Sequence, residues 1–227
     1  MVTAIFPAAG QSRRMCSTTN KNFLLLDGKP ILIQTLLKFS KSDKIDKLIV
    51  AAAVDEVEIV EEMLGGVAAL KPFKVVIGGS ERQYSIANAL KVIDDDCEII
   101  LVHDAARPLV SIKTIDEVVE AVRIYGGAIA AVPEKNTIKM IDSEGFVTNT
   151  PPRSKLVAVQ TPQGFSRDIL LKAYEQAAQD NFLGTDDSSL VERLGVKVKI
   201  VQSDSCNIKV TTPEDIQIAE TFIKSNI

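Results

Sequence analysis

The sequence is poor in the residues that most often carry metals, disulfides and acid–base chemistry. It has one histidine (His103) and three cysteines, Cys16, Cys97 and Cys206. An odd number of cysteines without Cys-x-x-Cys spacing argues against a disulfide framework and structural zinc, and favours a reducing compartment such as the cytoplasm. No cluster of histidine, cysteine and carboxylate residues is placed to cage a cation, so we expect no metal site made by the protein alone.

The chain also lacks the features of membrane proteins and of nucleic-acid-binding proteins. No apolar run approaches the roughly 18 residues that a membrane span needs, and the apolar N-terminus has no basic leader or cleavage site of a signal peptide. The formal net charge is −4, so nothing global attracts nucleic acid. An anionic ligand would have to be held by a local cluster of lysines and arginines.

What is present is an ordinary globular composition with alternating strands and helices. The 227 residues are 46% hydrophobic and 25% charged, which suits a single α/β domain over residues 1–227. Apolar runs, several of them continuous as in strands buried on both faces, predict strands at Thr3–Phe6, Lys47–Ala53, Lys74–Ile77, Glu98–His103, Ala128–Val132 and Lys197–Gln202.

Helices are expected in the gaps between these strands. Two of them are Glu81–Ile93 and Ser166–Ala178, each with an apolar face. The last begins at Thr212-Pro213-Glu214-Asp215, with a hydroxyl cap, a proline in the first turn and acids near the positive end of the helix dipole. This alternation predicts a Rossmann-like, doubly wound, mostly parallel sheet that binds ligands at the carboxyl ends of its strands.

Residues 136–153 break the alternation. Thr137–Ile141 and Phe146–Thr150 are typical of the two strands of a β-hairpin around Asp142-Ser143-Glu144-Gly145. The segment has too few apolar residues to be a core element, so we expect an arm that leaves the domain. Because an isolated hairpin is marginally stable in water, the arm needs a partner surface.

The loop after the first predicted strand carries the clearest chemical signal. Pro7-Ala8-Ala9-Gly10 has almost no side chain, so its amides can approach a ligand closely. Arg13, Arg14 and Lys21 follow, and exposed amides beside fixed cations suit a triphosphate. The loop matches neither the P-loop nor the dinucleotide fingerprint. Taken alone it could also be a tight strand-to-helix turn with solvated arginines.

Six blocks together resemble the 2-C-methyl-D-erythritol 4-phosphate cytidylyltransferase family of the non-mevalonate isoprenoid pathway. They span nearly the whole chain, and their joint order and spacing are specific although each alone is weak. The blocks are Pro7-Ala8-Ala9-Gly10 to Met15 with Lys21; Gly78-Gly79-Ser80-Glu81-Arg82 to Ser85; Val102-His103-Asp104-Ala105-Ala106-Arg107-Pro108; Gln160-Thr161-Pro162-Gln163; Thr185-Asp186-Asp187; and Asn207-Ile208-Lys209-Val210-Thr211-Thr212-Pro213-Glu214-Asp215.

The resemblance implies a fold and a reaction. The fold is a nucleotidyltransferase, glycosyltransferase-A-like version of the doubly wound sheet, with the β-hairpin arm protruding and packed on a second subunit of a homodimer. The reaction transfers the cytidylyl group of CTP to 2-C-methyl-D-erythritol 4-phosphate and releases pyrophosphate. The attacking phosphomonoester is largely dianionic at pH 7, since its second pKa is about 6. No general base is therefore needed, and Mg²⁺ is expected to arrive mainly with CTP.

The same resemblance implies roles for individual residues. Arg14 and Lys21 stabilise the pentavalent α-phosphate, and Arg153 and Lys209 position the attacking phosphate. The CTP-binding positions are Pro7, Ala8, Ala9, Gly10, Ser12, Gly79, Ser85, Asp104 and Ala105. The acceptor-binding positions are Asp104, Arg107, Thr137, Arg153, Thr161 and Lys209. If the arm is exchanged, Thr137 and Arg153 reach the neighbouring subunit's site.

Several residues inside these blocks receive no catalytic role. His103, at the end of an apolar strand, is expected to be a hydrogen-bonded structural residue, and Thr185-Asp186-Asp187 is expected to start a helix. Arg82 could contact the ligand or form a salt bridge that holds its loop, and Arg13 is open in the same way. Ser12, Asn20 and Asn136 stand where the family usually has glycine, proline and aspartate, and none of these changes removes a cation that the chemistry needs.

Three other functions compete with this interpretation. A ribitol-5-phosphate cytidylyltransferase is the nearest, but those enzymes tend to carry Ala-Gly-Gly and His-Asp-Ser-Val-Arg where this chain has Ala-Ala-Gly and His-Asp-Ala-Ala-Arg. A nicotinamide-dependent oxidoreductase would need the glycine fingerprint. A non-catalytic nucleotide-binding protein would not need Arg14, Lys21, Asp104 and Lys209 together.

Overall fold

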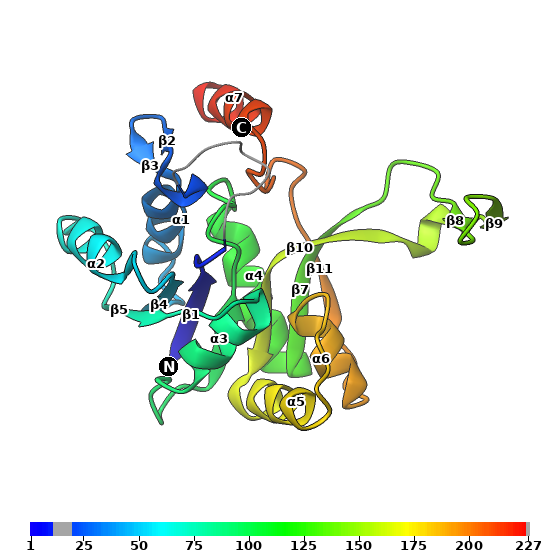
Figure 1. Ribbon diagram of the computed structural model, residues 1–227, viewed down its shortest axis with the longest axis horizontal. Helices are drawn as coiled ribbons and strands as arrows, with labels where there is room; N and C mark the ends of the chain where they lie inside the picture. The colour runs from blue at the N-terminus through cyan, green and yellow to red at the C-terminus, as the bar shows by residue number, and fades with distance from the viewer. Residues whose placement is uncertain (11–19, 226–227) are drawn as a thin grey trace.

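A seven-stranded sheet forms the centre of the molecule in the computed structural model (Figure 1), which describes residues 1–10 and 20–225. Its strand order is β5-β4-β1-β6-β10-β7-β11. The strands are β1 Val2–Pro7, β4 Lys47–Ala52, β5 Phe73–Ile77, β6 Ile99–Val102, β7 Gly127–Pro133, β10 Val157–Ser166 and β11 Lys199–Gln202.

The sheet is mostly parallel, which confirms the predicted fold class. Strands β5, β4, β1 and β6 pair in parallel, as do β7 and β11, whereas β10 is antiparallel to both of its neighbours. All six predicted strands are present with slightly different ends. Strand β10 was not predicted, because Thr161-Pro162-Gln163-Gly164 interrupts its apolar pattern and its register with β7 shifts between Val159 and Gln163.

Helices cover both faces of the sheet, as expected for strands buried on both sides. One face carries α1 Ile31–Ser40, α2 Val57–Gly65 and α4 Ile112–Tyr125. The other carries α3 Arg82–Leu90, α5 Arg167–Gln179 and α6 Asp187–Arg193. Alternate residues of β1 serve the two cores, since Ala4 and Phe6 belong to the first and Ile5 to the second. The predicted helices over 81–93 and 166–178 correspond to α3 and α5.

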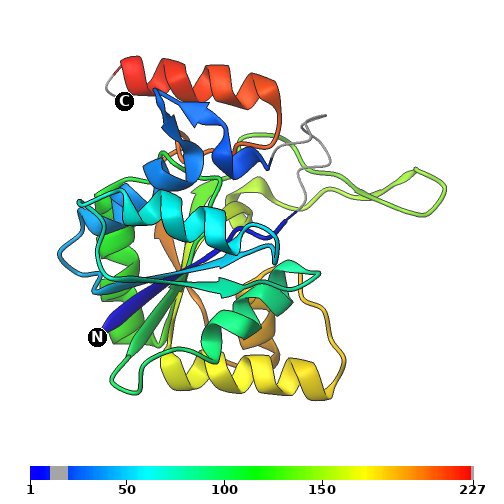
Figure 2. The same ribbon diagram turned by 60° about the vertical axis from the view of Figure 1, so that its left-hand side comes forward.

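The C-terminal helix α7, Pro213–Lys224, packs over a small hairpin made of β2 Leu25–Leu26 and β3 Lys29–Pro30 (Figure 2). Its start confirms the predicted cap. Asp215 Oδ2 accepts the backbone N–H groups of Thr211 at 2.7 Å and Thr212 at 2.9 Å. The cap matters for the site, because it fixes the end of the segment that carries Lys209. Among residues 1–10 and 20–225, none of the helices combines the length and apolarity that a bilayer crossing requires.

The expected hairpin is present as a protruding arm (Figure 1). Its strands, β8 Met140–Ile141 and β9 Val147–Asn149, are shorter than predicted. Asp142 Oδ1 closes the turn by accepting the N–H groups of Glu144 at 3.0 Å and Phe146 at 2.9 Å. Large apolar side chains on the arm are exposed, among them Ile141 at 63% and Phe146 at 67%, so the arm presents an apolar surface to its surroundings. The 3₁₀ turn η3, Arg153–Lys155, follows.

Gly164 allows β10 to pack against α4. A Cβ there would lie 2.5 Å from Leu101 Cδ2, 2.8 Å from Val122 Cγ2 and 2.9 Å from Val118 Cγ1, all in the buried core. We expect Gly164→Ala to lower the free energy of unfolding by about 1–3 kcal/mol through overpacking, measured by urea denaturation. Gly65→Ala is the matched control, because a Cβ there meets nothing within 4 Å. Equal effects of the two changes would contradict this packing.

Candidate active site

Loops at the carboxyl ends of β1, β5 and β6 and the segment after β11 surround one cavity of about 220 Å³. This is the edge where a doubly wound sheet binds its ligands. The cavity is lined by Pro7, Ala9, Gly10, Lys21, Asn22, Gly79, Ser80, Glu81, Arg82, Ser85, Asp104, Ala105, Ala106 and Lys209. A second hollow shares Ala9, Gly10 and Gly79–Glu81 and extends to Ala53, Val54 and Asp55, so the crevice continues past β4.

Two asparagines attach Lys21 to the end of β1. The Ala8 carbonyl accepts the side-chain amides of Asn20 at 3.2 Å and Asn22 at 3.1 Å, while the Ala8 N–H donates to the Ala51 carbonyl at 2.8 Å. Asn20 also caps the short helix η2, Lys21–Phe23. These contacts place Lys21 on the cavity wall. The sequence gives no signal for Asn22, because a lone asparagine carries no pattern.

Close packing of the β5–α3 loop explains its two glycines. A Cβ on Gly78 would lie 2.5 Å from the Cβ of Ala9, and one on Gly79 would lie 2.4 Å from the Cβ of Tyr84. Ser85 Oγ accepts the Gly79 N–H at 3.0 Å. The loop is therefore held against the β1 loop, and Gly79 and Ser85 reach the cavity with little side-chain bulk.

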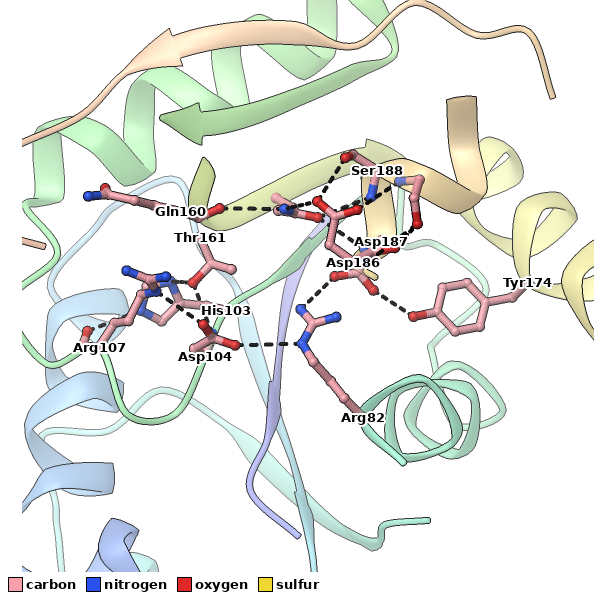
Figure 3. Close-up of polar contacts among 12 residues, drawn as sticks. Arg82, His103, Asp104, Arg107, Gln160, Thr161, Tyr174, Asp186, Asp187 and Ser188 are labelled. Carbon is pink, nitrogen blue, oxygen red and sulfur yellow. Dashed lines mark hydrogen bonds and ion pairs between the residues drawn. The ribbon is translucent and has the colours of Figure 1, made fainter. Parts of the chain in front are cut away.

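Asp104 is the charge centre of the cavity (Figure 3). It is 7% exposed and forms ion pairs with three cations: Arg107 from its own loop, and Arg82 and Lys209 from distant parts of the chain. Its Oδ2 lies 3.0 Å from Arg107 Nε and 3.1 Å from Lys209 Nζ, and its Oδ1 lies 3.5 Å from Arg82 Nε. Burial alone would raise the pKa of this carboxyl, but the fields of Lys209, Arg82 and Arg107 outweigh burial and hold the pKa well below its usual range.

His103 and Thr161 fix the backbone of Asp104 from below. His103 Nε2 lies 3.1 Å from the Arg107 carbonyl, which can only accept, so Nε2 carries the proton. Nδ1 of the neutral ring then accepts the Thr161 hydroxyl at 3.0 Å, and Thr161 Oγ1 accepts the Asp104 N–H at 3.0 Å. Burial lowers the pKa of His103 to about 3. The ring thus acts as a neutral structural residue, as expected from the sequence.

Asn207 holds the segment of Lys209 against β10. Its side-chain amide donates to Gln160 Oε1 and to the Thr161 carbonyl, both at 2.9 Å, and its carbonyl accepts Arg107 Nη1 at 2.8 Å. These contacts bring Lys209, which lies near the C-terminus, to Asp104, the carboxylate that also pairs with Arg82.

The block Thr185-Asp186-Asp187 is a helix start, as predicted. Asp186 caps α6 by accepting the Ser189 N–H at 2.9 Å. Asp187 is fully buried and accepts Arg82 Nη2 at 2.6 Å. Of the two roles that the sequence left open for Arg82, the salt bridge is therefore present, while Arg82 also lines the cavity.

The predicted site residues fall into four groups. Those on the cavity wall are Pro7, Ala9, Gly10, Lys21, Gly79, Ser85, Asp104, Ala105 and Lys209. Ala8, Arg107 and Thr161 lie beside it and engage its wall through the contacts above. Thr137 and Arg153 are exposed on the arm, where Arg153 Nη1 donates to the Lys135 carbonyl at 2.9 Å. Ser12, Arg13 and Arg14 lie outside the described residues. Wall residues without a predicted role are Asn22, Ser80, Glu81, Arg82 and Ala106.

This arrangement is that of a nucleotide-binding α/β enzyme. Small-residue loops and cations meet at the carboxyl ends of parallel strands, where backbone amides and fixed charges can hold phosphates.

Known proteins place the chain more closely. The family model described as 2-C-methyl-D-erythritol 4-phosphate cytidylyltransferase matches residues 2–225. The enzyme of that name from Caldanaerobacter subterraneus is 46% identical over 224 residues, which is 98% of this chain and 99% of the relative. Its Bacillus mycoides counterpart is 48% identical over 223 residues, 98% of each.

Solved structures agree. The 4-diphosphocytidyl-2C-methyl-D-erythritol synthase of Anaerococcus prevotii is 32% identical with a TM-score of 0.87, covering 98% of this chain and 96% of that one. The Francisella tularensis 2-C-methyl-D-erythritol 4-phosphate cytidylyltransferase is 31% identical with a TM-score of 0.81, covering 97% and 98%. The chain belongs to the 2-C-methyl-D-erythritol 4-phosphate cytidylyltransferase family, which confirms the resemblance carried by its six blocks.

The buried neutral His103 predicts an acid-dependent loss of stability. The unfolded chain binds a proton on His103 below about 6.5, whereas the folded chain binds it only near 3. Unfolding therefore takes up a proton between these two pH values, and the contribution of His103 to the free energy of unfolding decreases as pH falls. We expect the difference in unfolding free energy between wild type and His103→Gln to narrow by at most about 1.4 kcal/mol per pH unit from pH 6.5 toward 4. Urea titrations at several pH values measure it; a gap that stays constant would contradict a buried neutral imidazole.

Proposed function

We propose that this chain transfers the cytidylyl group of CTP to 2-C-methyl-D-erythritol 4-phosphate, with 4-diphosphocytidyl-2-C-methyl-D-erythritol and pyrophosphate as products. Family membership supports the reaction, and the relatives' names favour methylerythritol over ribitol phosphate. One structural observation carries the proposal further. Lys21 and Lys209, from opposite ends of the chain, line one cavity together with the Pro7–Gly10 loop and Asp104.

The chemistry requires charge compensation rather than proton abstraction. The acceptor phosphate is already largely dianionic near pH 7, and it attacks the α-phosphorus of CTP as pyrophosphate leaves. Bringing two polyanions together is the main barrier, and preorganised cations lower it. We assign Lys21 and Arg14 to the developing charge on the α-phosphate, and Lys209 and Arg153 to the attacking phosphate. A neutral, buried His103 is consistent with a mechanism without a general base.

The nucleotide would occupy the part of the cavity formed by the β1 and β5 loops. Pro7–Gly10 and Ser12 would offer amides to the phosphates, while Gly79, Ser85 and Ala105 would flank the cytidine. The tight contacts of Gly78 with Ala9 and of Gly79 with Tyr84 keep this wall close. A close wall of small residues favours a pyrimidine over a purine.

The acceptor would lie against Asp104. A carboxylate held ionised can accept hydrogen bonds from the hydroxyls of a polyol. Thr161 Oγ1 already accepts the Asp104 N–H and donates to His103, so its contact with the acceptor would use its remaining lone pair. Arg107 donates from Nε to Asp104 and from Nη1 to the Asn207 carbonyl, so its contact with the acceptor would use its other N–H groups. Thr137 would add a hydroxyl from the arm.

Mg²⁺ fits this site as a companion of CTP. Among the described residues, no three His, Cys, Asp or Glu side chains gather as a protein cage would require. Asp104 is on the cavity wall, but three cations surround it, which disfavours a metal ion held by protein alone. Mg²⁺ is commonly held by substrate phosphates and few carboxylates, and when bound it neutralises part of the triphosphate charge. Of the two carboxylates on the described cavity wall, Glu81 and Asp104, Asp104 is the one that we assign to this contact.

We further propose a homodimer joined by the arm, acting in the cytoplasm. The arm exposes Met140, Ile141, Phe146 and Val147, each more than half accessible, and Arg153 is not among the described residues that line the cavity of its own chain. A second subunit would cover these apolar side chains and receive Thr137 and Arg153 in its site. The cytoplasm is supported by CTP, an intracellular nucleotide, and by the free thiols Cys97 and Cys206.

A substrate panel tests the reaction. Pyrophosphate release from CTP should be fast with 2-C-methyl-D-erythritol 4-phosphate and undetectable with unphosphorylated methylerythritol, because Lys209 and the arginines need a phosphate partner. CTP should exceed ATP and GTP in kcat/KM. A higher kcat/KM for ribitol 5-phosphate than for methylerythritol 4-phosphate would reassign the acceptor.

Subunit complementation tests the shared site. Lys21→Ala and Arg153→Ala should each lower kcat by about two orders of magnitude or more, as loss of a fixed charge donor typically does. Mixed dimers of the two variants should regain part of the activity, because one site then holds both wild-type residues. Lys29→Ala, which changes an exposed lysine on β3, is the matched control and should change kcat less than twofold. Verified mixed dimers without recovery would place Arg153 in its own subunit's site.

A further inference from the structure

We propose that Arg82 is a positioning residue that aims the Asp104 carboxylate at the acceptor, using buried Asp187 as its anchor. The inference rests on the proposed function, since it assigns the acceptor hydroxyls to Asp104. Arg82 lies at the start of α3, and Figure 3 shows its guanidinium between the two carboxylates.

The anchor is rigid. Asp187 is fully buried. Its Oδ2 accepts Arg82 Nη2 at 2.6 Å and its Oδ1 accepts the Tyr174 hydroxyl at 2.6 Å. Gln163 Oε1 accepts the backbone N–H groups of Asp187 and Ser188, both at 3.1 Å. Tyr174 of α5 therefore holds Oδ1, and Gln163 of β10 holds the backbone, both independently of Arg82. The direction in which Oδ2 meets Arg82 is set by these contacts rather than by solvent.

The other side of Arg82 meets the reacting region. Nε lies 3.5 Å from Asp104 Oδ1, while Oδ2 faces Arg107 and Lys209. The two oxygens of Asp104 are therefore held from opposite sides, and the plane of the carboxylate depends on both. An incoming phosphate would compete with Asp104 for Lys209, and Arg82 would then keep Oδ1 in place.

A guanidinium suits this task better than an ammonium. Its planar fork presents Nε and Nη2 in fixed directions, so one side chain can bridge two carboxylates, whereas lysine carries a point charge. The simpler explanation is that Arg82 only neutralises buried Asp187. Removing one partner of such a pair is strongly destabilising, so a single neutral variant cannot separate the two explanations.

Charge-balanced variants separate them. Arg82→Gln with Asp187→Asn removes both charges while leaving two amides able to exchange a hydrogen bond. We expect its Tm to return toward wild type, well above that of Arg82→Gln alone. Its KM for 2-C-methyl-D-erythritol 4-phosphate at saturating CTP should nevertheless stay raised about tenfold. Arg82→Lys, which keeps the charge, should hold Tm near wild type and also raise this KM, so the test survives if the double variant fails to fold.

A double-mutant cycle with Asp104→Asn then tests whether the effect of Arg82 on the acceptor KM passes through Asp104. If Arg82 acts through Asp104, Arg82→Lys should raise the acceptor KM about tenfold when Asp104 is intact. The same change should raise it less than threefold in a protein that already carries Asp104→Asn, since coupled residues are not additive. Equal effects in both backgrounds, or an acceptor KM that recovers together with Tm, would overturn the positioning role. The wild-type protein in the same assay distinguishes failure of this inference from failure of the proposed function. A wild type that does not turn over 2-C-methyl-D-erythritol 4-phosphate would overturn both.

Discussion

The buried carboxylate of Asp104 is the interaction on which the site depends. Asp104 lies just after β6. Its carboxylate forms ion pairs with Arg82 at the start of α3, Arg107 in its own loop and Lys209 in the segment after β11. Without that negative charge the three cations would repel one another inside a partly buried space. With it, and with Asp187 beside Arg82, three cations face two carboxylates. The residual positive charge, with Lys21 nearby, is what a polyanionic substrate pair would neutralise.

The position of this cluster follows from the strand order. The chain runs from β1 outward through β4 to β5 on one side, and then returns to place β6 on the other side of β1. The loops after β1 and β6 therefore leave adjacent strands in opposite directions, which opens a crevice at the point where the order reverses. Gly10 and Asp104 line the same cavity for this reason. The antiparallel β10 lies on the other side of β6. It supplies Thr161, which holds the backbone of Asp104, and Gln163, which holds the backbone of Asp187.

Local signals in the sequence predicted the parallel strands and the residues that follow them, because burial on both faces leaves continuous apolar runs and strand ends carry the loops. The cap at Thr212 and the helix start at Asp186 were predictable for the same local reason. The ion pair of Arg82 with Asp187 joins residues far apart in the sequence, and Asn22 acts through contacts with Ala8, so only tertiary structure reveals them. Strand β10 was hidden because Thr161 and Gln163 look like loop residues, although both are buried and hydrogen-bonded.

The residues of the site differ in how firmly the rest of the fold holds them. Asp104 is held by Thr161 of β10, Arg82 is held by Asp187 of α6, and the segment of Lys209 is held to β10 through Asn207. These contacts preorganise this side of the cavity. Arg153 stands on an exposed arm, and it donates to the Lys135 carbonyl at the base of the same arm. An exposed ion in water contributes little by itself, so the role proposed for Arg153 requires another surface that fixes the arm. In the proposed homodimer the partner subunit would fix the exposed arm, so assembly of the dimer would complete the site.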